Sequence, residues 1–168
     1  MSHAIRIHAH GGPEVMRWDP HDPREPGRGE VLIRQTAIGL NFIDIYERTG
    51  LYPNVLPSGL GREGAGVVEA LGPGVRGPAV GERVAYVSSQ AGSYAQHRCM
   101  AADSLVSIPD GVSDRLAAAA MLKGLTAQFL LRRTHRVRKG DVAVVHAAAG
   151  GVGLIAAQWA RHLGATVI

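Results

Sequence analysis

The sequence predicts a protein of mixed α and β structure, in which a barrel or sandwich of short strands precedes the opening strand–helix–strand unit of a parallel sheet. Up to Ala101, short apolar runs are separated by glycine and proline, which is typical of strands joined by turns. After Ser113, the spacing becomes helical, and a continuous apolar run and a glycine-rich turn follow. This change places a domain boundary at residue 123 and divides the chain into 1–123 and 124–168.

The bulk composition is that of a folded protein and excludes several classes. The 168 residues are 46% hydrophobic and 19% charged, which suffices to bury a core. The net charge of +4 is mild, and the densest basic stretch, 132–140, contains no aromatic residue for base stacking, so we expect no nucleic-acid partner. The longest apolar run, 116–122, is too short to span a bilayer, and no signal-peptide pattern begins the chain. We therefore expect a cytoplasmic protein without a membrane partner.

Five extended runs are expected in the first domain. The first, 4–9, alternates Ile5 and Ile7 with polar residues and stops at a Gly-Gly-Pro break. The other runs are 30–41, 64–72, 81–89 and 92–101. The single cysteine, Cys99, lies in the last of these; it is expected to be buried and unreactive, and alone it forms neither an internal disulfide nor a cysteine-based zinc site. We interpret the segment 41–53 as a loop.

A helix opens the next part of the chain. Ser113 is well placed to cap it, with Asp114 in its favourable first turn. Gly124 is expected to interrupt this helix, and helical spacing resumes over 125–135.

A strand–turn–helix–strand pattern completes the chain. Residues 142–146 are continuously apolar up to the final histidine, as is typical of a strand buried on both faces of a parallel sheet. An amphipathic helix follows the glycine-rich turn and ends at Gly164, with two basic residues in its last turn. Its apolar stripe consists of Val152, Ile155, Trp159 and Leu163. Residues 165–168 begin a second strand, so the pattern is that of the first βαβ unit of a Rossmann fold.

The glycine-rich turn matches the dinucleotide fingerprint G-x-G-x-x-G with one change. The three positions are Ala148, Gly150 and Gly153, so alanine replaces the first glycine. A Cβ at the second position would keep the backbone away from the pyrophosphate, and the third glycine lets the helix pack closely. The start of the helix offers unpaired amides and a positive dipole end to phosphates. The residues expected to bind the cofactor here are Ala149, Gly150, Gly151, Val152 and Gly153.

Two questions stay open at this loop. One is whether it is only a tight strand-to-helix turn that binds no ligand. The other is the choice between NAD and NADP, because the residue that distinguishes them lies about 20 residues beyond the loop, and the sequence stops before it.

Six segments of the sequence carry a family resemblance. They are AHGGPEV, GLNFIDIYERTGLYP, LPSGLGREGAGVV, GERVAY, LKGLTAQFLLRRT and HAAAGGVGLIAAQWARHLGA. In order and spacing they resemble the NADPH-dependent quinone oxidoreductases, zinc-free members of the medium-chain dehydrogenase/reductase superfamily related to zeta-crystallin. The resemblance implies a GroES-like β-barrel domain followed by the start of a Rossmann domain, NADPH as cofactor and a quinone as substrate. It also implies a longer chain that forms a homodimer, of which this sequence is an N-terminal portion.

The same resemblance indicates whether the protein binds a zinc ion. Zinc alcohol dehydrogenases of the superfamily place a cysteine, a histidine and a second cysteine where this sequence has Asn41, Arg62 and Leu122, none of which ligates zinc. Glu63 and Asp44 alone suit zinc poorly, so no metal is expected. These two carboxylates are expected instead to pair with a neighbouring arginine such as Arg62 or Arg48.

Metal-free hydride transfer from NADPH to a quinone is the predicted reaction, because a quinone is already an electrophile and the protein mainly holds two rings close together. The candidate catalytic residues are Asn41, Tyr46 and Tyr52, which line the nicotinamide and quinone site. One tyrosine donates a hydrogen bond to the developing hydroquinone oxygen; the alternative is that both are half-buried under a loop. By resemblance, Lys123 and Thr126 approach the nicotinamide end of the cofactor. The alternative for Lys123 is that it is an ordinary surface lysine at a helix break.

Two further functions remain open. The same hydride chemistry would reduce an activated alkene such as an enone. Alternatively, a chain that stops at Ile168 is an inactive truncated fragment, acting only as a binding or structural module, with 142–145 and Trp159 insufficiently covered.

Overall fold

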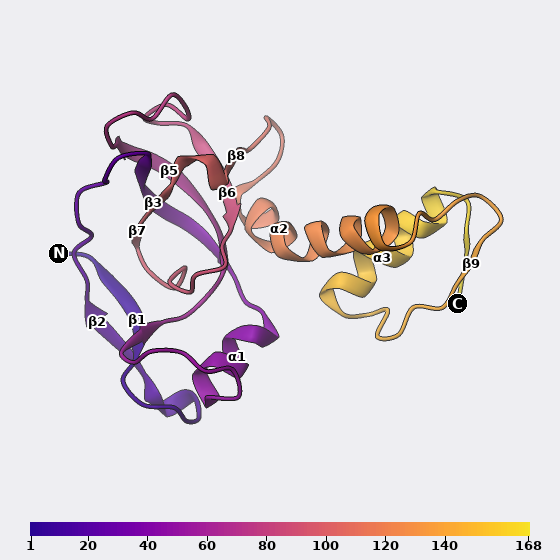
Figure 1. The fold of residues 1–168 in the computed structure, drawn as a ribbon, viewed down its shortest axis with the longest axis horizontal. Coiled ribbons are helices and arrows are strands. Elements are labelled where there is room, and N and C mark those ends of the chain that lie inside the picture. Colours follow the sequence, from indigo (N-terminus) through magenta and orange to yellow (C-terminus); the bar gives the residue numbers. More distant parts are fainter. The chain divides into compact units, whose positions relative to one another are not determined.

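The computed structural model describes residues 1–168, which divide into two compact units, Met1–Ala119 and Ala120–Ile168. Figure 1 labels the elements and colours them along the chain. The division falls inside helix α2 (Asp114–Gln128), on the N-terminal side of the boundary predicted at residue 123. No helix has the length and apolar character needed to cross a membrane.

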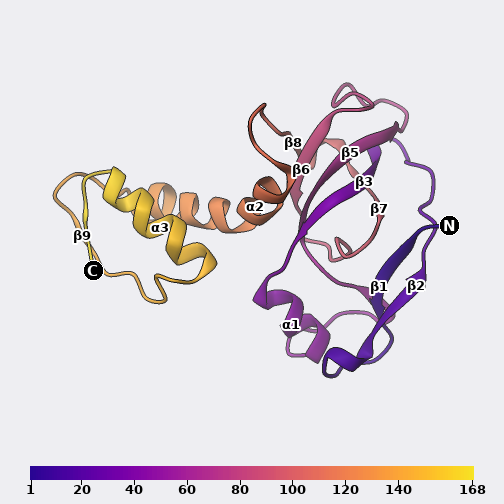
Figure 2. The ribbon, with the colours of Figure 1, turned by 180° about the vertical axis from the view of Figure 1, so that it is seen from behind.

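The first unit is built from two antiparallel sheets, which Figure 2 shows from behind. The larger sheet has the order β7-β3-β5-β6-β8, and the smaller has the order β2-β1-β4. Their strands are β1 (His3–Ile7), β2 (Met16–Pro20), β3 (Glu30–Gly39), β4 (Ser58–Gly59), β5 (Glu63–Leu71), β6 (Arg83–Val87), β7 (His97–Ala101) and β8 (Leu105–Ser107). Short 3-10 turns lie at Pro13–Val15 and Ala102–Ser104. Two register shifts in the β3–β5 ladder increase the twist of the larger sheet.

The predicted strands are largely confirmed, and one segment is corrected. Four of the expected runs correspond to β1, β3, β5 and β6, whereas the fifth, 92–101, is shorter and forms only β7. The segment 41–53, interpreted as a loop, contains helix α1 (Phe42–Thr49), which ends at Gly50 with a left-handed φ of 82°. The interpretation of this segment as a loop was therefore wrong, and the helix places its aromatic residues on a regular scaffold.

The core of the first unit follows from strand alternation. Its buried members are Val31, Ile33, Val68, Val84, Tyr86 and Met100. Val31 and Ile33 stand two residues apart on β3 and therefore point to the same face. Cys99, the neighbour of Met100 on β7, is half-buried rather than buried, and its Sγ donates to the carbonyl of Arg24 at 3.0 Å. Burial raises the pKa of this thiol, which keeps it protonated and is consistent with the expected lack of reactivity.

Helix α2 begins as predicted but does not stop at Gly124. The Ser113 hydroxyl accepts a hydrogen bond from the amide of Leu116 at 3.2 Å, which confirms the predicted cap. The helix then runs through Gly124 to Gln128 and continues as a π-helical turn, η3 (Phe129–Thr134). The predicted interruption was wrong because a single glycine costs a helix only about 1 kcal/mol, which an otherwise favourable helix tolerates.

The second unit contains the predicted βαβ pattern. Strand β9 (Val142–Ala143) pairs in parallel with β10 (Thr166–Val167), and helix α3 (Gly151–His162) connects them. The strand expected over 142–146 is thus shorter than predicted, although the amide of Val145 still donates to the carbonyl of Ile168 at 2.9 Å. Gly164, with a φ of 90°, follows α3 as expected.

Small residues form the core of the second unit. Its buried members are Ala127, Leu131, Val137, Ala156, Ala160 and Ala165. Trp159 packs against this cluster but is only half-buried, so its cover is partial. Val142 and Val144 are each 66% exposed, as expected for a sheet of two strands.

Candidate nucleotide and substrate sites

The turn between β9 and α3 has the geometry of an anion-binding loop. Its amide at Gly150 donates to the carbonyl of Ala147 at 2.8 Å, and Gly150 then forms the N-cap of α3. The amide of Leu154 donates to the carbonyl of Gly150 at 2.8 Å, in the first bond of the helical pattern. The amides that precede this bond belong to Gly151, Val152 and Gly153. They are the groups at a helix start that have no partner within the helix and that suit phosphate oxygens.

Two positions of the turn depend on how closely the backbone packs. A Cβ at Gly153 would lie 2.3 Å from the carbonyl oxygen of Ala147 and 2.8 Å from the Cα of Ala148. The predicted close approach at the third fingerprint glycine is therefore present. Ala147 has a left-handed φ of 53°, which costs a residue with a side chain roughly 1–2 kcal/mol. The bend that a glycine normally supplies is thus made by an alanine.

Lys123 lies against the start of α3. A Cβ at Gly151 would come within 2.9 Å of its Cδ and 3.0 Å of its Cε, so the aliphatic chain of Lys123 crosses the first helical residue. The side chain of a cationic residue therefore lies beside the first residue of α3, an arrangement suited to phosphate charge. Thr126 is half-buried one turn further along α2, and its hydroxyl donates to the carbonyl of Leu122 at 2.7 Å.

A hollow of about 400 Å³ lies beside the turn. Its walls come from η3, from the chain of β9 and from the first turns of α3, and they are mostly apolar. The second unit therefore combines a polar helix start with an apolar cavity, which is the usual composition of a small-molecule site.

The first unit carries an exposed group of three aromatic rings, here called the aromatic ladder: Phe42, Tyr46 and Tyr52. Phe42 and Tyr46 stand four residues apart on one face of α1, with ring centroids 6.3 Å apart. The centroids of Tyr46 and Tyr52 are 5.3 Å apart, and the amide of Tyr52 donates to the carbonyl of Tyr46 at 3.1 Å. Tyr52 is 48% exposed and Phe42 is 73% exposed. Only Tyr46 is half-buried, so the ladder presents aromatic surface to solvent.

Asn41 serves the start of α1. It is buried, forms the N-cap of the helix, and donates from Nδ2 to Oε1 of Glu63 at 2.8 Å. Its own amide donates to Oδ2 of Asp44 at 2.9 Å, within a capping box. The structure therefore places Asn41 in the interior, at the start of α1, and not on the exposed surface.

The residues at the positions that correspond to zinc ligands make other interactions. Arg62 forms an ion pair with Glu47 of α1 and also donates to the carbonyl of Ser89. Arg62 thus pairs with a further carboxylate, Glu47, whereas Asp44 accepts from Asn41 and Tyr94, and Glu63 accepts from Asn41. No group of three or more histidine, cysteine, aspartate or glutamate side chains has a metal-binding arrangement.

Two contributors to this region escaped the sequence prediction. Glu47 lies on the helix that was interpreted as a loop, and a loop gives no reason to expect a buried carboxylate. Tyr94, whose hydroxyl donates to Oδ2 of Asp44 at 2.8 Å, lies 50 residues further along the chain, and no local pattern signals that contact.

Known proteins resemble this chain over its whole length. Residues 27–110 match the alcohol dehydrogenase GroES-like domain. The chain is 53% identical over 169 residues to a quinone oxidoreductase of Pseudomonas aeruginosa, and the match covers 100% of this chain and 52% of that protein. It is 47% identical to a 2-haloacrylate reductase of a Burkholderia species, over 98% of this chain and 51% of that protein.

A solved structure agrees with these sequence matches. The crystal structure of Escherichia coli quinone oxidoreductase complexed with NADPH superposes with a TM-score of 0.95 at 46% identity, covering 98% of this chain and 51% of that one. The chain spans about half the length of the curated relatives it matches. The expected fold, a GroES-like domain followed by the beginning of a nucleotide-binding domain, is confirmed. The chain therefore belongs to the alcohol dehydrogenase GroES-like domain family and, within it, is similar to the quinone oxidoreductases.

Proposed function

We propose that the protein carrying this chain is an NADPH-dependent reductase that transfers hydride to a quinone without a metal ion. The observation that carries this proposal is the start of α3, where unpaired amides and the side chain of Lys123 come together. The similarity to quinone oxidoreductases, one of them solved with NADPH, supports the choice of cofactor and substrate.

The residues of the second unit fit the phosphates of a dinucleotide. The amides of Gly151, Val152 and Gly153 would donate hydrogen bonds to pyrophosphate oxygens, and Gly150 carries no Cβ to hold the backbone away. Lys123 would offset the phosphate charge. Towards the nicotinamide end we assign Thr126, whose hydroxyl oxygen retains acceptor capacity after donating to Leu122. NADPH, when bound, supplies the hydride.

The aromatic ladder fits a flat acceptor. Tyr46 and Tyr52 offer ring faces for stacking against a quinone and hydroxyl groups for its oxygens. Reduction adds one hydride from NADPH and one proton from solvent to give the hydroquinone and NADP⁺. The phenol of Tyr52 donates a hydrogen bond to the oxygen on which negative charge develops. The buried Asn41 contributes by capping the start of α1.

The proposal is tested by quinone-dependent oxidation of NADPH by the product of the complete reading frame. Replacement of Tyr52 by Phe keeps the ring and removes the hydroxyl, so we expect kcat to fall at least about tenfold, with NADPH affinity unchanged. Unchanged quinone turnover in Tyr52→Phe would remove the assigned role of this hydroxyl.

A second candidate substrate is an activated alkene. It is favoured by the 47% identity to a 2-haloacrylate reductase, whose name describes addition of hydrogen to a carbon–carbon double bond. The two substrates are distinguished by comparing kcat/KM for p-benzoquinone, 2-chloroacrylate and a simple enone with the same enzyme preparation. A higher kcat/KM for either alkene than for the quinone would replace the proposed substrate.

A further inference from the structure

We propose that Tyr94 and Asp44 act as a positioning pair, which holds helix α1 and thereby the aromatic ladder in the geometry needed for quinone reduction. This inference rests on the proposed function. Neither residue belongs to the aromatic ladder, and both act through the start of α1.

Asp44 is the third residue of α1 and joins two hydrogen bonds at one oxygen. Its Oδ2 accepts from the amide of Asn41 at 2.9 Å and from the hydroxyl of Tyr94 at 2.8 Å. Its own amide donates to the carbonyl of Asn41 at 3.0 Å. The bond from Tyr94 therefore secures the same carboxylate that caps the helix.

Tyr94 itself is held firmly. Its amide donates to the carbonyl of Leu60 at 2.9 Å, and its carbonyl accepts from the amide of Ile5 at 2.7 Å. Its ring lies against Gly61, where a Cβ would come within 2.3 Å of Cδ1. Gly61 has a φ of 85°, so both its conformation and this contact call for glycine. The backbone of Tyr94 is thus fixed by two hydrogen bonds, and its ring by the contact with Gly61.

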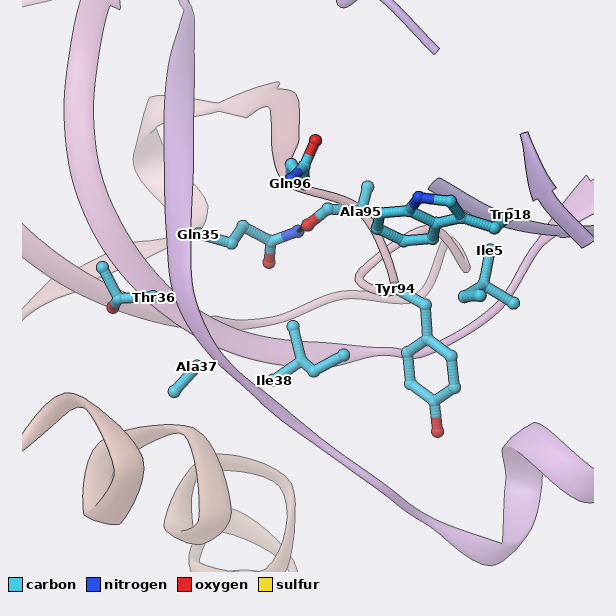
Figure 3. A pocket seen from close by; sticks show the side chains of 9 residues that line it. All are labelled: Ile5, Trp18, Gln35, Thr36, Ala37, Ile38, Tyr94, Ala95 and Gln96. Carbon is cyan, nitrogen blue, oxygen red and sulfur yellow. Dashed lines mark hydrogen bonds between the residues drawn. The ribbon is translucent and has the colours of Figure 1, made fainter. Parts of the chain in front are cut away.

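The ring of Tyr94 also forms a wall of an apolar hollow of about 220 Å³. Figure 3 shows it beside Ile5 and Ile38, with its hydroxyl directed away from Trp18. The hydroxyl therefore leaves the apolar hollow to reach Asp44, and a polar contact is made from an otherwise apolar environment.

The environment makes the hydrogen bond from Tyr94 important to Asp44. The carboxylate is buried, and its Oδ1 has no hydrogen-bond partner. Burial raises the pKa of Asp44, as do the nearby carboxylates of Glu47 and Glu63, whereas the bonds from Asn41 and Tyr94 oppose that rise. Removal of one of two donors from a buried carboxylate leaves its desolvation largely uncompensated.

A loosened start of α1 displaces the rings that follow it. Tyr46 lies two residues beyond Asp44 on the same helix, and Tyr52 is bonded through its amide to the carbonyl of Tyr46. The expected effect is therefore on the quinone side of the reaction. The glycine turn that we assign to NADPH belongs to the second compact unit, whereas α1 belongs to the first.

The test compares Tyr94→Phe with Tyr86→Phe in the product of the complete reading frame. Tyr86 is a fully buried tyrosine of the same compact unit, whose hydroxyl donates to Oε1 of Gln35 on β3 and not to a residue of α1. We expect Tyr94→Phe to lower kcat/KM for p-benzoquinone about tenfold, to leave the Kd for NADPH unchanged, and to speed hydrogen exchange of the α1 amides. Tyr86→Phe is expected to lower the Tm without either effect.

Substitution of Asp44 separates the acceptor role from simple packing. Asn at position 44 retains an oxygen that can accept from both Asn41 and Tyr94, whereas Ala retains none. Asp44→Asn is therefore expected to keep more quinone activity than Asp44→Ala, and adding Tyr94→Phe to Asp44→Ala is expected to cost little further.

The outcomes are distinguishable. Wild-type quinone kinetics and unchanged α1 exchange in Tyr94→Phe would overturn the positioning pair, as would equal effects of Tyr94→Phe and Tyr86→Phe. If the wild-type enzyme fails to oxidise NADPH with any quinone, the proposed function fails. The exchange rates of the α1 amides then still decide whether Tyr94 holds the helix.

Discussion

Replacement of Gly153 by Ala tests whether the turn before α3 needs its close backbone approach. The added Cβ would lie 2.3 Å from a carbonyl oxygen and 2.8 Å from a Cα, and neither backbone atom can rotate away as a side-chain end would. Forcing one methyl group into a packed site costs about 1–3 kcal/mol, and alanine regains up to about 1 kcal/mol as a better helix former. We therefore expect a net loss of up to about 2 kcal/mol in the free energy of unfolding.

The same substitution at Gly124 is the matched control. Gly124 also lies within a helix, but nothing stands within 4 Å of where its Cβ would be. Gly124→Ala should therefore stabilise the protein by about 0.5–1 kcal/mol. One chemical change is thus expected to have opposite signs at two helical positions.

Both variants are measured by urea denaturation followed by circular dichroism, and by NADPH titration followed by nucleotide fluorescence. Displacement of the turn moves the amides of α3, so Gly153→Ala is expected to weaken NADPH binding at least about tenfold. A Gly153→Ala variant with wild-type stability and NADPH affinity would refute both the steric reasoning and the assignment of this turn to the phosphates.

Two further predictions concern ion pairs. Arg62→Met removes the partner of Glu47, whose carboxylate is buried, and should cost about 3–5 kcal/mol of stability, whereas Arg34→Met breaks an exposed pair and should cost less than about 1 kcal/mol. Equal losses in urea denaturation would contradict this ranking. Hydrogen bonding to Arg24 lowers the pKa of Glu30 from 4.5 to about 2. A lowered folded-state pKa means that the stabilisation is fully present above pH 4.5 and is lost as the pH falls towards about 2. The difference in Tm between wild type and Glu30→Gln should therefore shrink over that range. A difference that does not change with pH would contradict the stabilising role of the Glu30 carboxylate.

The sequence predicted the strands better than the helices. Alternation in 4–9 and the glycine-bounded apolar runs found four strands, because short apolar runs between turn residues are typical of strands. Helix α1 was missed although its signals were present. Asn41 and Asp44 stand three residues apart, as in a capping box, and Gly50 follows the last turn. Phe42, Ile45 and Tyr46 also follow the helical spacing i, i+3, i+4, but a pattern confined to eight residues is too short to separate a helix from a loop without those end signals.

Of the two candidate sites, one was predictable from the sequence and the other was not. The glycine turn was predictable because its chemistry is local: five consecutive residues and a helix start define it. The environment of α1 was not predictable, because Arg62 and Tyr94 reach Glu47 and Asp44 from distant parts of the chain. Contacts of that kind depend on the tertiary fold and leave no spacing pattern in the sequence.

The left-handed alanine at position 147 has a consequence for how such loops are recognised. By letter count, the fingerprint loses its first glycine at Ala148, so a search demanding glycine there would pass over this chain. The backbone nevertheless makes the bend one residue earlier, with a methyl group in a conformation that usually belongs to glycine. In this chain the fingerprint is better treated as a constraint on torsion angles than as a string of letters.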